Sequence, residues 1–385
     1  MKIKICIDAS NIREGGGVTH LSELLNAASK DRHDIDSILI FAPQSTLDTI
    51  LSKSWIIKKN SPDISKGILY RIYWQRFVLA RLINEAECNI LFVPGGSDVS
   101  GFHPVVSMSQ NLLPFDWKQL KRYGISLFTV KMLMLRCTQS LSFRRSNGVI
   151  FLTDYARNLV ASVVKDISSR TAIINHGIHS RFSNSPKKQF EISNYSTKKP
   201  FSIIYVSTID MYKNQWVVAE AVARIKKSNI PVELKLIGSS REAALTKLQD
   251  CLTSLDQSRE FIHYLGIIPF DDLHTHYAQA DLMVFASSCE NMPNILLEGM
   301  AAGLPIACSN LGPMPEILGD AGIYFNPENC DDVTNAIRTL VGSSEMRTEM
   351  SQSAYRISQS FSWSRCADET FSFLASVLKD YENNK

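Results

Sequence analysis

The stretch DLMVFASSCENMPNILLEGMAAGLPIACS (281–309) determines how the second half of this chain folds. DLMVFAS at its start predicts a buried strand, and PIACS at its end predicts another. Pro293 ends the preceding segment, Asn294 can cap, and ILLEGMAA is a good helix former. We therefore expect a helix that begins near residue 294 and stops at Gly303. The order strand, helix, strand predicts part of a parallel sheet.

Two carboxylates lie at a fixed spacing in this stretch. Glu290 falls in the loop before the predicted helix, and Glu298 falls on its first turns. The unpaired backbone N–H groups of the helix start and the positive end of the helix dipole would point at whatever lies in front of that loop. Residues 287–303 therefore predict a site for an anionic or hydroxyl-rich ligand.

The alternation of strands and helices continues on both sides of this stretch. Residues 201–360 are predicted to form one Rossmann-like, doubly wound domain with a parallel sheet. Its other predicted strands are FSIIYVS (201–207), VELKLIGSS (232–240), FIHYLG (261–266) and GIYF (322–325), and its other helices cover 214–227, 242–255, 270–279 and about 331–342. LGPMPE (311–316) is predicted as a turn. Residues 361–385 could cap this domain or pack back on the first.

The first half predicts a second doubly wound domain over residues 1–182, and the polar segment 183–200 is predicted as a linker. Its start, KIKICIDAS, is a strand followed by a loop of three glycines, Gly15 to Gly17, and then by a helix. Further strands are predicted at 37–42, 89–93, 105–115, 148–153 and 171–178, and an aromatic helix at 68–83. Ligands bind at the carboxyl ends of such strands, so the glycine loop, Gly95–Gly96, Gln110–Asn111 and Thr153 should face one crevice.

Composition narrows the class of protein. A chain of 385 residues with 45% apolar content can bury two cores. Its eight cysteines are scattered without a CxxC pair, which is typical of reduced thiols in a cytosolic protein. The start MKIKICIDAS reads as a charged strand and not as a signal peptide, and no stretch approaches the roughly 18 apolar residues of a membrane span.

Charge is distributed unevenly. Residues 1–190 hold 25 of the 41 Lys and Arg residues but 14 of the 38 Asp and Glu residues. The helix at 68–83 and the segment 118–145 both mix basic and apolar side chains. One interpretation is a surface that contacts lipid head groups, and the other is an uneven but solvated surface. No known nucleic-acid-binding motif accompanies the basic face, so we expect no nucleic-acid partner.

Five segments together resemble family 4 glycosyltransferases of the GT-B fold. They are YVSTIDMYKN (205–214), LIGSS (236–240), YLGIIPFDDL (264–273), residues 280–327 and FSW (361–363). Glu290 and Glu298, with seven residues between them, match the EX7E motif of the retaining enzymes in that family. The first half is similar more loosely, through the glycine loop, SMSQNLLPF (107–115) and VIFLTDYAR (149–157).

This resemblance implies two Rossmann-like domains that face a cleft. It implies transfer of a hexose from a nucleotide-diphosphate sugar, bound mainly by the second domain, to an acceptor bound mainly by the first. It also implies no cofactor and no essential metal. We expect a glycan acceptor, lipid-linked and used in cell-surface polysaccharide synthesis, and a cytosolic protein that contacts the anionic inner face of the membrane.

The resemblance also implies roles for individual residues. Lys213 would contact the donor diphosphate, Glu290 the hydroxyls of the donor sugar, and Glu298 those of the ribose. Gly16 and Gly17 would approach the phosphates from the first domain. The remaining donor-binding positions are Thr208, Gly266, Ile267, Asn291, Met292, Pro293 and Asn294.

Two positions depart from the family pattern. Thr208 stands near a position where many members carry an arginine, for which Arg13 or Arg181 could substitute. Gln110 stands where many carry a histidine, and an amide can hydrogen-bond a sugar but cannot act as a general base. The family's favoured front-face route tolerates this, because the departing phosphate accepts the acceptor's proton. A double displacement would need a nucleophile, for which Asp116 is a candidate.

Two alternatives remain open at the level of the sequence. One is another GT-B enzyme, such as a retaining phosphorylase or a sucrose-type synthase. The other is a catalytically weak nucleotide-sugar-binding subunit of a larger assembly, which the departures at Thr208 and Gln110 would fit.

Overall fold

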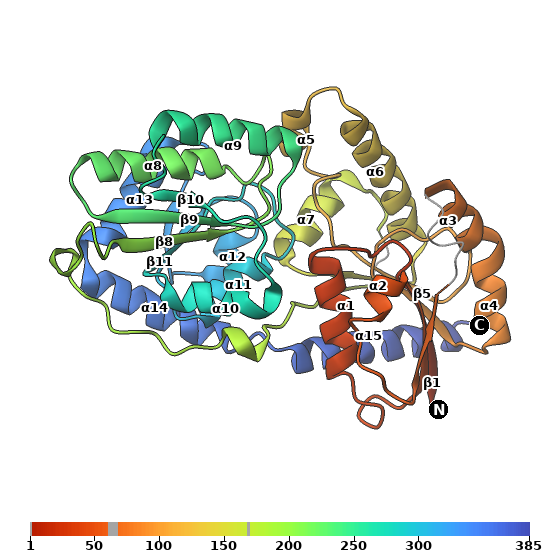
Figure 1. Cartoon of the computed structure of the whole chain (residues 1–385). Coiled ribbons are helices and arrows are strands. Elements are labelled where there is room, and N and C mark those ends of the chain that lie inside the picture. The colour runs from red at the N-terminus through yellow and green to blue at the C-terminus, as the bar shows by residue number, and fades with distance from the viewer. Residues whose placement is uncertain (1, 61–67, 168–169) are drawn as a thin grey trace. The chain divides into compact units, whose positions relative to one another are not determined.

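The computed structural model describes residues 2–60, 68–167 and 170–385, and no residue predicted for the site falls outside these ranges. The chain divides into two compact units (Figure 1). Unit 1 comprises Met1–Leu120, Gly124–Gly177 and Ser362–Lys385, and unit 2 comprises Lys121–Tyr123 and Ile178–Phe361. The final segment, from Ser362, therefore groups with the first half of the chain.

Unit 1 contains a seven-stranded sheet in the order β3-β2-β1-β4-β5-β6-β7, and every neighbouring pair is parallel. Strands β4 and β6 are buried along their whole length, as expected when both faces of a parallel sheet are covered. The strands are β1 (Ile3–Asp8), β2 (Ile35–Phe41), β3 (Ile56–Lys59), β4 (Ile90–Val93), β5 (Val105–Met108), β6 (Gly148–Phe151) and β7 (Thr171–Ile173). β3 is not predicted from the sequence, because it is short and half polar.

The helices of unit 1 begin with α1, where Gly16 and Gly17 form the first turn instead of continuing the predicted glycine loop. Gly15 alone precedes the helix, with a φ of 69° that favours glycine. The helices are α1 (Gly16–Ala27), α2 (Gln44–Leu47), α3 (Ile68–Trp74), α4 (Ala80–Glu85), α5 (Trp117–Leu120), α6 (Leu127–Arg145), α7 (Asp154–Val163) and α15 (Trp363–Asn383). A π-helical turn, Gln75–Leu79, joins α3 to α4. α15 packs against α1 and β4.

Unit 2 contains a six-stranded parallel sheet in the order β10-β9-β8-β11-β12-β13. Its strands are β8 (Phe201–Val206), β9 (Val232–Ile237), β10 (Ile262–Tyr264), β11 (Leu282–Phe285), β12 (Ile306–Ser309) and β13 (Ile323–Phe325). In both units the strand order reverses beside the first strand, so the predicted pair of doubly wound α/β domains is confirmed.

The helices of unit 2 pack in two groups. α8 contacts α9 and α13, whereas α11 contacts α14, and Figure 1 shows α8 and α9 on one side of the sheet with α10, α11 and α14 on the other. The helices are α8 (Gln215–Lys227), α9 (Glu242–Leu255), α10 (Phe270–Gln279), α11 (Asn294–Ala301), α12 (Met314–Leu318), α13 (Cys330–Gly342) and α14 (Ser344–Ser358). The predicted turn at LGPMPE was wrong in part, because its last residues begin α12, with Pro315 in the first turn.

The segment predicted as a linker, residues 183–200, belongs to unit 2, and the chain crosses between units at Gly177 and Ile178. The buried side chain of Arg347 explains this. Its guanidinium donates to the carbonyl of Phe190 at 2.5 Å and to the side chain of Gln189 at 3.1 Å. It also donates to the carbonyl of Leu340, at 2.6 Å, so it fastens the segment to α13.

Among the described residues, no helix has the length and apolar composition required to cross a membrane.

Candidate functional site

The loop between β11 and α11 holds the predicted carboxylates. α11 begins at Asn294, but Pro293 occupies the N-cap position and no side chain caps the helix, so the predicted cap by Asn294 was wrong. The missing N–H of proline removes one donor that would otherwise need a partner. Gly303 has a φ of 65°, and a Cβ there would lie 2.8 Å from the backbone oxygen of Asn184. This close approach and this φ explain why the helix stops there.

Lys213 and Glu290 form an ion pair at the carboxyl ends of β8 and β11, which are neighbouring strands. Their side chains are only 8% and 15% exposed. The ammonium group also lies over the rings of Tyr212 and Phe285, 5.1 Å and 5.6 Å from the centroids. Tyr205 donates a hydrogen bond of 2.6 Å to the Lys213 carbonyl, which holds the lysine backbone in place.

Asn214 connects the loop after β8, which holds Lys213, to the loop after β11, which holds Glu290. It has a left-handed backbone with a φ of 54°, and it precedes α8. Its side-chain amide donates to the carbonyl of Ala286 and to the hydroxyl of Ser288, both at 2.8 Å. The N–H of Ser288 donates in turn to the carbonyl of Tyr212, at 2.8 Å. These bonds set the separation of the loops that hold Lys213 and Glu290.

Glu298 on α11 accepts a hydrogen bond of 3.1 Å from the hydroxyl of Tyr277 on α10. Burial raises the pKa of Glu298 to about 8, although the bond from Tyr277 opposes the rise. A carboxyl group with this pKa is mostly protonated at neutral pH. The sequence does not identify Tyr277, because nothing in the local pattern around it indicates a contact with Glu298.

Thr208 and Arg241 lie in the loops after β8 and β9. The Thr208 hydroxyl is 3.0 Å from that of Ser239. Arg241 donates from Nε to Asp210 at 2.6 Å, and Tyr123 donates to the other carboxylate oxygen at 2.6 Å. Asp210 is nearly buried, so it fixes the position of the half-exposed arginine. Arg241 is not among the residues predicted for the site, although it directly follows the LIGSS segment.

The sequence offers two possible substitutes for an arginine near Thr208, and these are Arg13 and Arg181. Arg181 pairs with Asp271 on α10 and stacks over the ring of Phe270, 4.8 Å from its centroid. Arg13 belongs to unit 1. Within unit 2, Arg241 is held beside the Lys213 loop through Asp210, whose carbonyl accepts from the N–H of Lys213 at 3.0 Å. Arg122 of the same unit also reaches this loop, where it donates to the side chain of Asn214 at 2.8 Å.

Gly266 and Ile267 follow β10. Gly266 has a φ of 71°, and its carbonyl accepts from the N–H of Gly238 at 2.8 Å. Ile267 is 74% exposed. In the loop before α11, Asn291 and Met292 are buried. The loop after β10 is thus partly exposed at the carboxyl end of that strand.

Unit 1 brings Gln110 against the start of α1. The Gln110 side-chain nitrogen lies 3.0 Å from Nδ1 of His20, and a Cβ at Gly17 would lie 3.1 Å from Oε1 of Gln110. Burial, with a smaller effect from the adjacent His176, lowers the pKa of His20 well below its usual value. In the tautomer of His20 protonated at Nε2, Nδ1 accepts a hydrogen bond from the amide nitrogen of Gln110, and the amide oxygen then lies toward Gly17. The rings of His20 and His176 are tilted by 31° with centroids 4.7 Å apart, although the sequence shows no spacing that pairs them.

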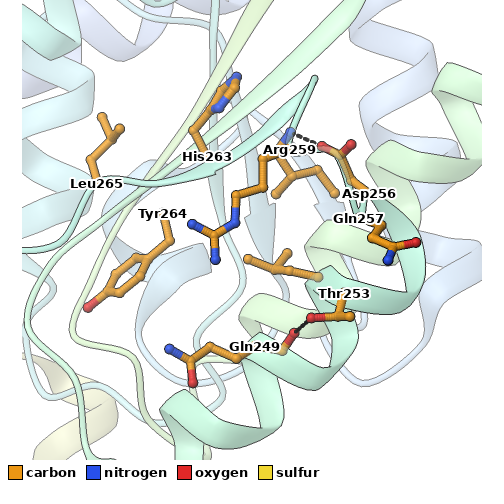
Figure 2. Close-up of a pocket in the computed structure, with 10 residues that line it drawn as sticks. Gln249, Thr253, Asp256, Gln257, Arg259, His263, Tyr264 and Leu265 are labelled. Atoms are coloured by element: carbon orange, nitrogen blue, oxygen red, sulfur yellow. Dashed lines mark hydrogen bonds between the residues drawn. The ribbon is translucent and has the colours of Figure 1, made fainter.

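A cavity of about 570 Å³ lies elsewhere in unit 2, between α9 and β10 (Figure 2). Asp256 in its wall accepts backbone N–H bonds from Glu260, Phe261 and Ile262, which lower the pKa of this carboxyl despite its burial. None of the predicted site residues lines the cavity, although Leu265 does and is the neighbour of Gly266.

The fold is that of GT-B glycosyltransferases. The chain superposes on the Anabaena protein HepE, solved with UDP and glucose, with a TM-score of 0.72 at 18% identity over 97% of this chain and all of that one. For WaaG, a glycosyltransferase involved in lipopolysaccharide biosynthesis, the TM-score is 0.70 at 12% identity, over 97% and 99% of the chains. For sucrose-phosphate synthase from Thermosynechococcus elongatus it is 0.76 at 14% identity, over 98% and 100%. At these identities the similarity defines the fold.

The family match is confined to unit 2. Residues 200–343 match the family of glycosyl transferases group 1. O-antigen chain mannosyltransferase B of Escherichia coli is 33% identical over 110 residues, which are 29% of each chain. Spore coat protein SA of Bacillus subtilis is 25% identical over 252 residues, which are 62% of this chain and 65% of that one. This chain thus spans less than two thirds of either relative, and the family match supports a group 1 glycosyltransferase over residues 200–343.

Proposed function

We propose that this protein is a retaining glycosyltransferase that moves a sugar from a nucleotide-diphosphate donor to a glycan acceptor. The observation that supports it most is the buried Lys213–Glu290 pair at the carboxyl ends of adjacent strands, where doubly wound sheets bind ligands. The group 1 match covers both residues, and the related proteins include a mannosyltransferase.

The donor would change the partners of this pair. A diphosphate carries negative charge that needs protein cations, and Lys213 can turn from Glu290 to a phosphate oxygen. Glu290 is then free to accept hydrogen bonds from the hydroxyls of the donor sugar. Because the pair is mostly buried, each charge keeps a partner only if the exchange is concerted.

Arg241 supplies a second cation for the diphosphate in this proposal, in place of an arginine at Thr208. The Asp210 carboxylate orients the guanidinium through Nε. Glu298 accepts from the ribose hydroxyls. Backbone groups of residues 266–267 and 291–294, together with Gly16 and Gly17 of unit 1, complete donor binding. Neither a metal nor a cofactor takes part.

The transfer proceeds by front-face attack. The bond from the anomeric carbon to the diphosphate breaks as the acceptor oxygen approaches the same face of the sugar, and the leaving phosphate oxygen accepts the acceptor's proton. Gln110 holds a sugar hydroxyl through its oxygen, which His20 and Gly17 direct. No enzymic nucleophile is needed, so Asp116 has no covalent role.

The acceptor in this proposal is a lipid-linked glycan used for cell-surface polysaccharide, and the protein works at the cytosolic face of the membrane. The names of two similar proteins support it, one an O-antigen mannosyltransferase and one a lipopolysaccharide glycosyltransferase.

A nucleotide-sugar-binding subunit without strong catalysis is the second candidate. Threonine at 208 and glutamine at 110 favour it, because they replace a cation and a base that many members of the resembled family carry.

A thermal-shift screen with UDP-, GDP- and ADP-sugars tests the proposal. A donor at 100 times its Kd should stabilise the protein by about 2.7 kcal/mol. The same donor is then incubated with wild type and Glu290→Gln, and nucleotide release is followed. Release by wild type alone supports a transferase, stabilisation without release supports a binding subunit, and no stabilisation by any donor would overturn both.

A further inference from the structure

Helix α6 of unit 1 presents an apolar stripe to solvent. Leu127, Val130, Met134 and Leu141 are 91%, 52%, 53% and 39% exposed, and Ile125 just before the helix is fully exposed. Their spacing of three, four and seven residues places them along one helix face. A surface helix normally shows polar side chains on this face, so the stripe is an unusual exposure of large apolar groups.

The opposite face of α6 fixes this orientation. Gln139 and Ser142 are buried there together with Met132 and Phe143. The Ser142 hydroxyl accepts from the N–H of Asp98 at 2.8 Å. Ser142 is therefore bound on the inward side of α6, and rotating the helix to bury the stripe would break this bond.

The charged residues in the segment around the stripe are all basic. Residues 117–153 contain no Asp or Glu, and their basic residues are Lys118, Lys121, Arg122, Lys131, Arg136, Arg144 and Arg145. Lys131, Arg144 and Arg145 are exposed on α6 itself. Exposed apolar side chains beside cations, on a helix of 19 residues, suit the interface of an anionic membrane, where apolar groups enter the acyl boundary and cations contact head groups.

We propose that α6, with Ile125 before it, binds an anionic lipid surface. Leu127, Val130 and Met134 enter the boundary between head groups and acyl chains, while Lys131 and Arg145 contact anionic head groups. A second copy of this chain fits less well, because a two-fold contact through α6 would bring two sets of cations together. This proposal depends on the proposed function in one respect, namely that lipid binding would give access to a lipid-linked acceptor.

The test measures lipid binding, and transfer activity does not enter it. The full chain is sedimented with vesicles of phosphatidylcholine alone or with 30% phosphatidylglycerol. We compare wild type with Leu127→Glu/Met134→Glu and with the control Leu51→Glu/Ile57→Glu, which changes two exposed apolar residues elsewhere in unit 1. Lys131→Gln/Arg145→Gln tests the charges. Because all these side chains are exposed, thermal midpoints should stay close to wild type.

Wild type and the control should bind the anionic vesicles more tightly than the neutral ones, and salt should weaken this binding. Leu127→Glu/Met134→Glu should bind at least about tenfold more weakly, since it loses apolar contact and adds repulsion. Each cation removed should weaken binding about fivefold. Failure of wild type to bind anionic vesicles, or equal losses in the control, would overturn the proposal. So would a dimer in solution that only the α6 variants dissociate, because it would assign the stripe to a second copy.

Discussion

Lys213 and Glu290, 77 positions apart in the sequence, form an ion pair whose side chains are 8% and 15% exposed. Burial makes the pair costly unless each charge keeps a partner. A site that holds such a pair beside the open ends of β8 and β11 is prepared to exchange one partner for an anionic ligand. The first prediction follows from this pair.

Removing one member of the Lys213–Glu290 pair should change the free energy of unfolding and the turnover to different extents. Lys213→Ala leaves Glu290 buried without its cation, and we expect the free energy of unfolding to fall by about 3 kcal/mol. Glu290→Gln keeps the shape of the side chain and an oxygen that can accept from Lys213, so the protein should still fold, with a smaller loss of stability than Lys213→Ala. Both variants should lose turnover by about 100-fold to 1,000-fold. Chemical denaturation and a nucleotide-release assay measure the two effects.

The double variant Lys213→Ala/Glu290→Gln is the matched control for this prediction. It removes both charges, so it should recover most of the stability lost in Lys213→Ala without recovering turnover. Turnover close to wild type in either single variant would contradict the site assignment.

Glu298 should make both stability and donor binding depend on pH. Its folded pKa of about 8 lies above its ordinary value of 4.5, so the folded state favours the protonated carboxyl. The stabilising contribution is full below pH 4.5 and is lost as pH rises through about 8. As the pH rises through this range, the thermal midpoint of wild type should therefore fall relative to that of Glu298→Gln.

Donor binding should show the opposite trend, because a carboxylate accepts from ribose hydroxyls better than a carboxyl group does. The Kd of wild type should decrease from pH 6.5 to 8.5, and that of Glu298→Gln should change little. Calorimetry at the two pH values measures it. Parallel pH profiles in the two proteins would show that another group titrates.

Arg241 should contribute donor affinity that an arginine at 208 can replace. Arg241→Ala should raise the Kd of the donor about 10-fold to 100-fold, which is the range for a charged hydrogen bond. Adding Thr208→Arg to that variant should restore part of the affinity. Arg224→Ala is the control, since Arg224 forms surface ion pairs with Glu220 and Asp331 in the same unit. Equal losses in the control would argue against a specific contact.

Gly17 and Gln110 should be coupled. A Cβ at Gly17 would lie 3.1 Å from Oε1 of Gln110, so Gly17→Ala should displace the amide and lower turnover with little change in thermal midpoint. Gln110→Ala removes the clash along with the amide. The double variant should then be no worse than Gln110→Ala alone, and a double-mutant cycle in turnover measures this coupling. Additive losses would mean that Gly17 acts independently of Gln110.

The sequence by itself determined most strands of the two sheets and their order along the chain. The apolar runs became the buried strands β8 and β11, and the helices over 242–255 and 270–279 match α9 and α10. It also placed Lys213, Glu290 and Glu298 at the ends of these elements. Local periodicity suffices here because a buried parallel strand must be apolar along its length.

Only the tertiary structure decided which residues meet. The partnership of Lys213 with Glu290, of Glu298 with Tyr277 and of Gln110 with His20 depends on strand order, which brings together segments that are distant in the chain. The inward side of α6 depends likewise on Ser142 and Asp98. The physical reason is that a parallel sheet sets the carboxyl ends of non-consecutive strands side by side, and no local pattern records which strand is the neighbour.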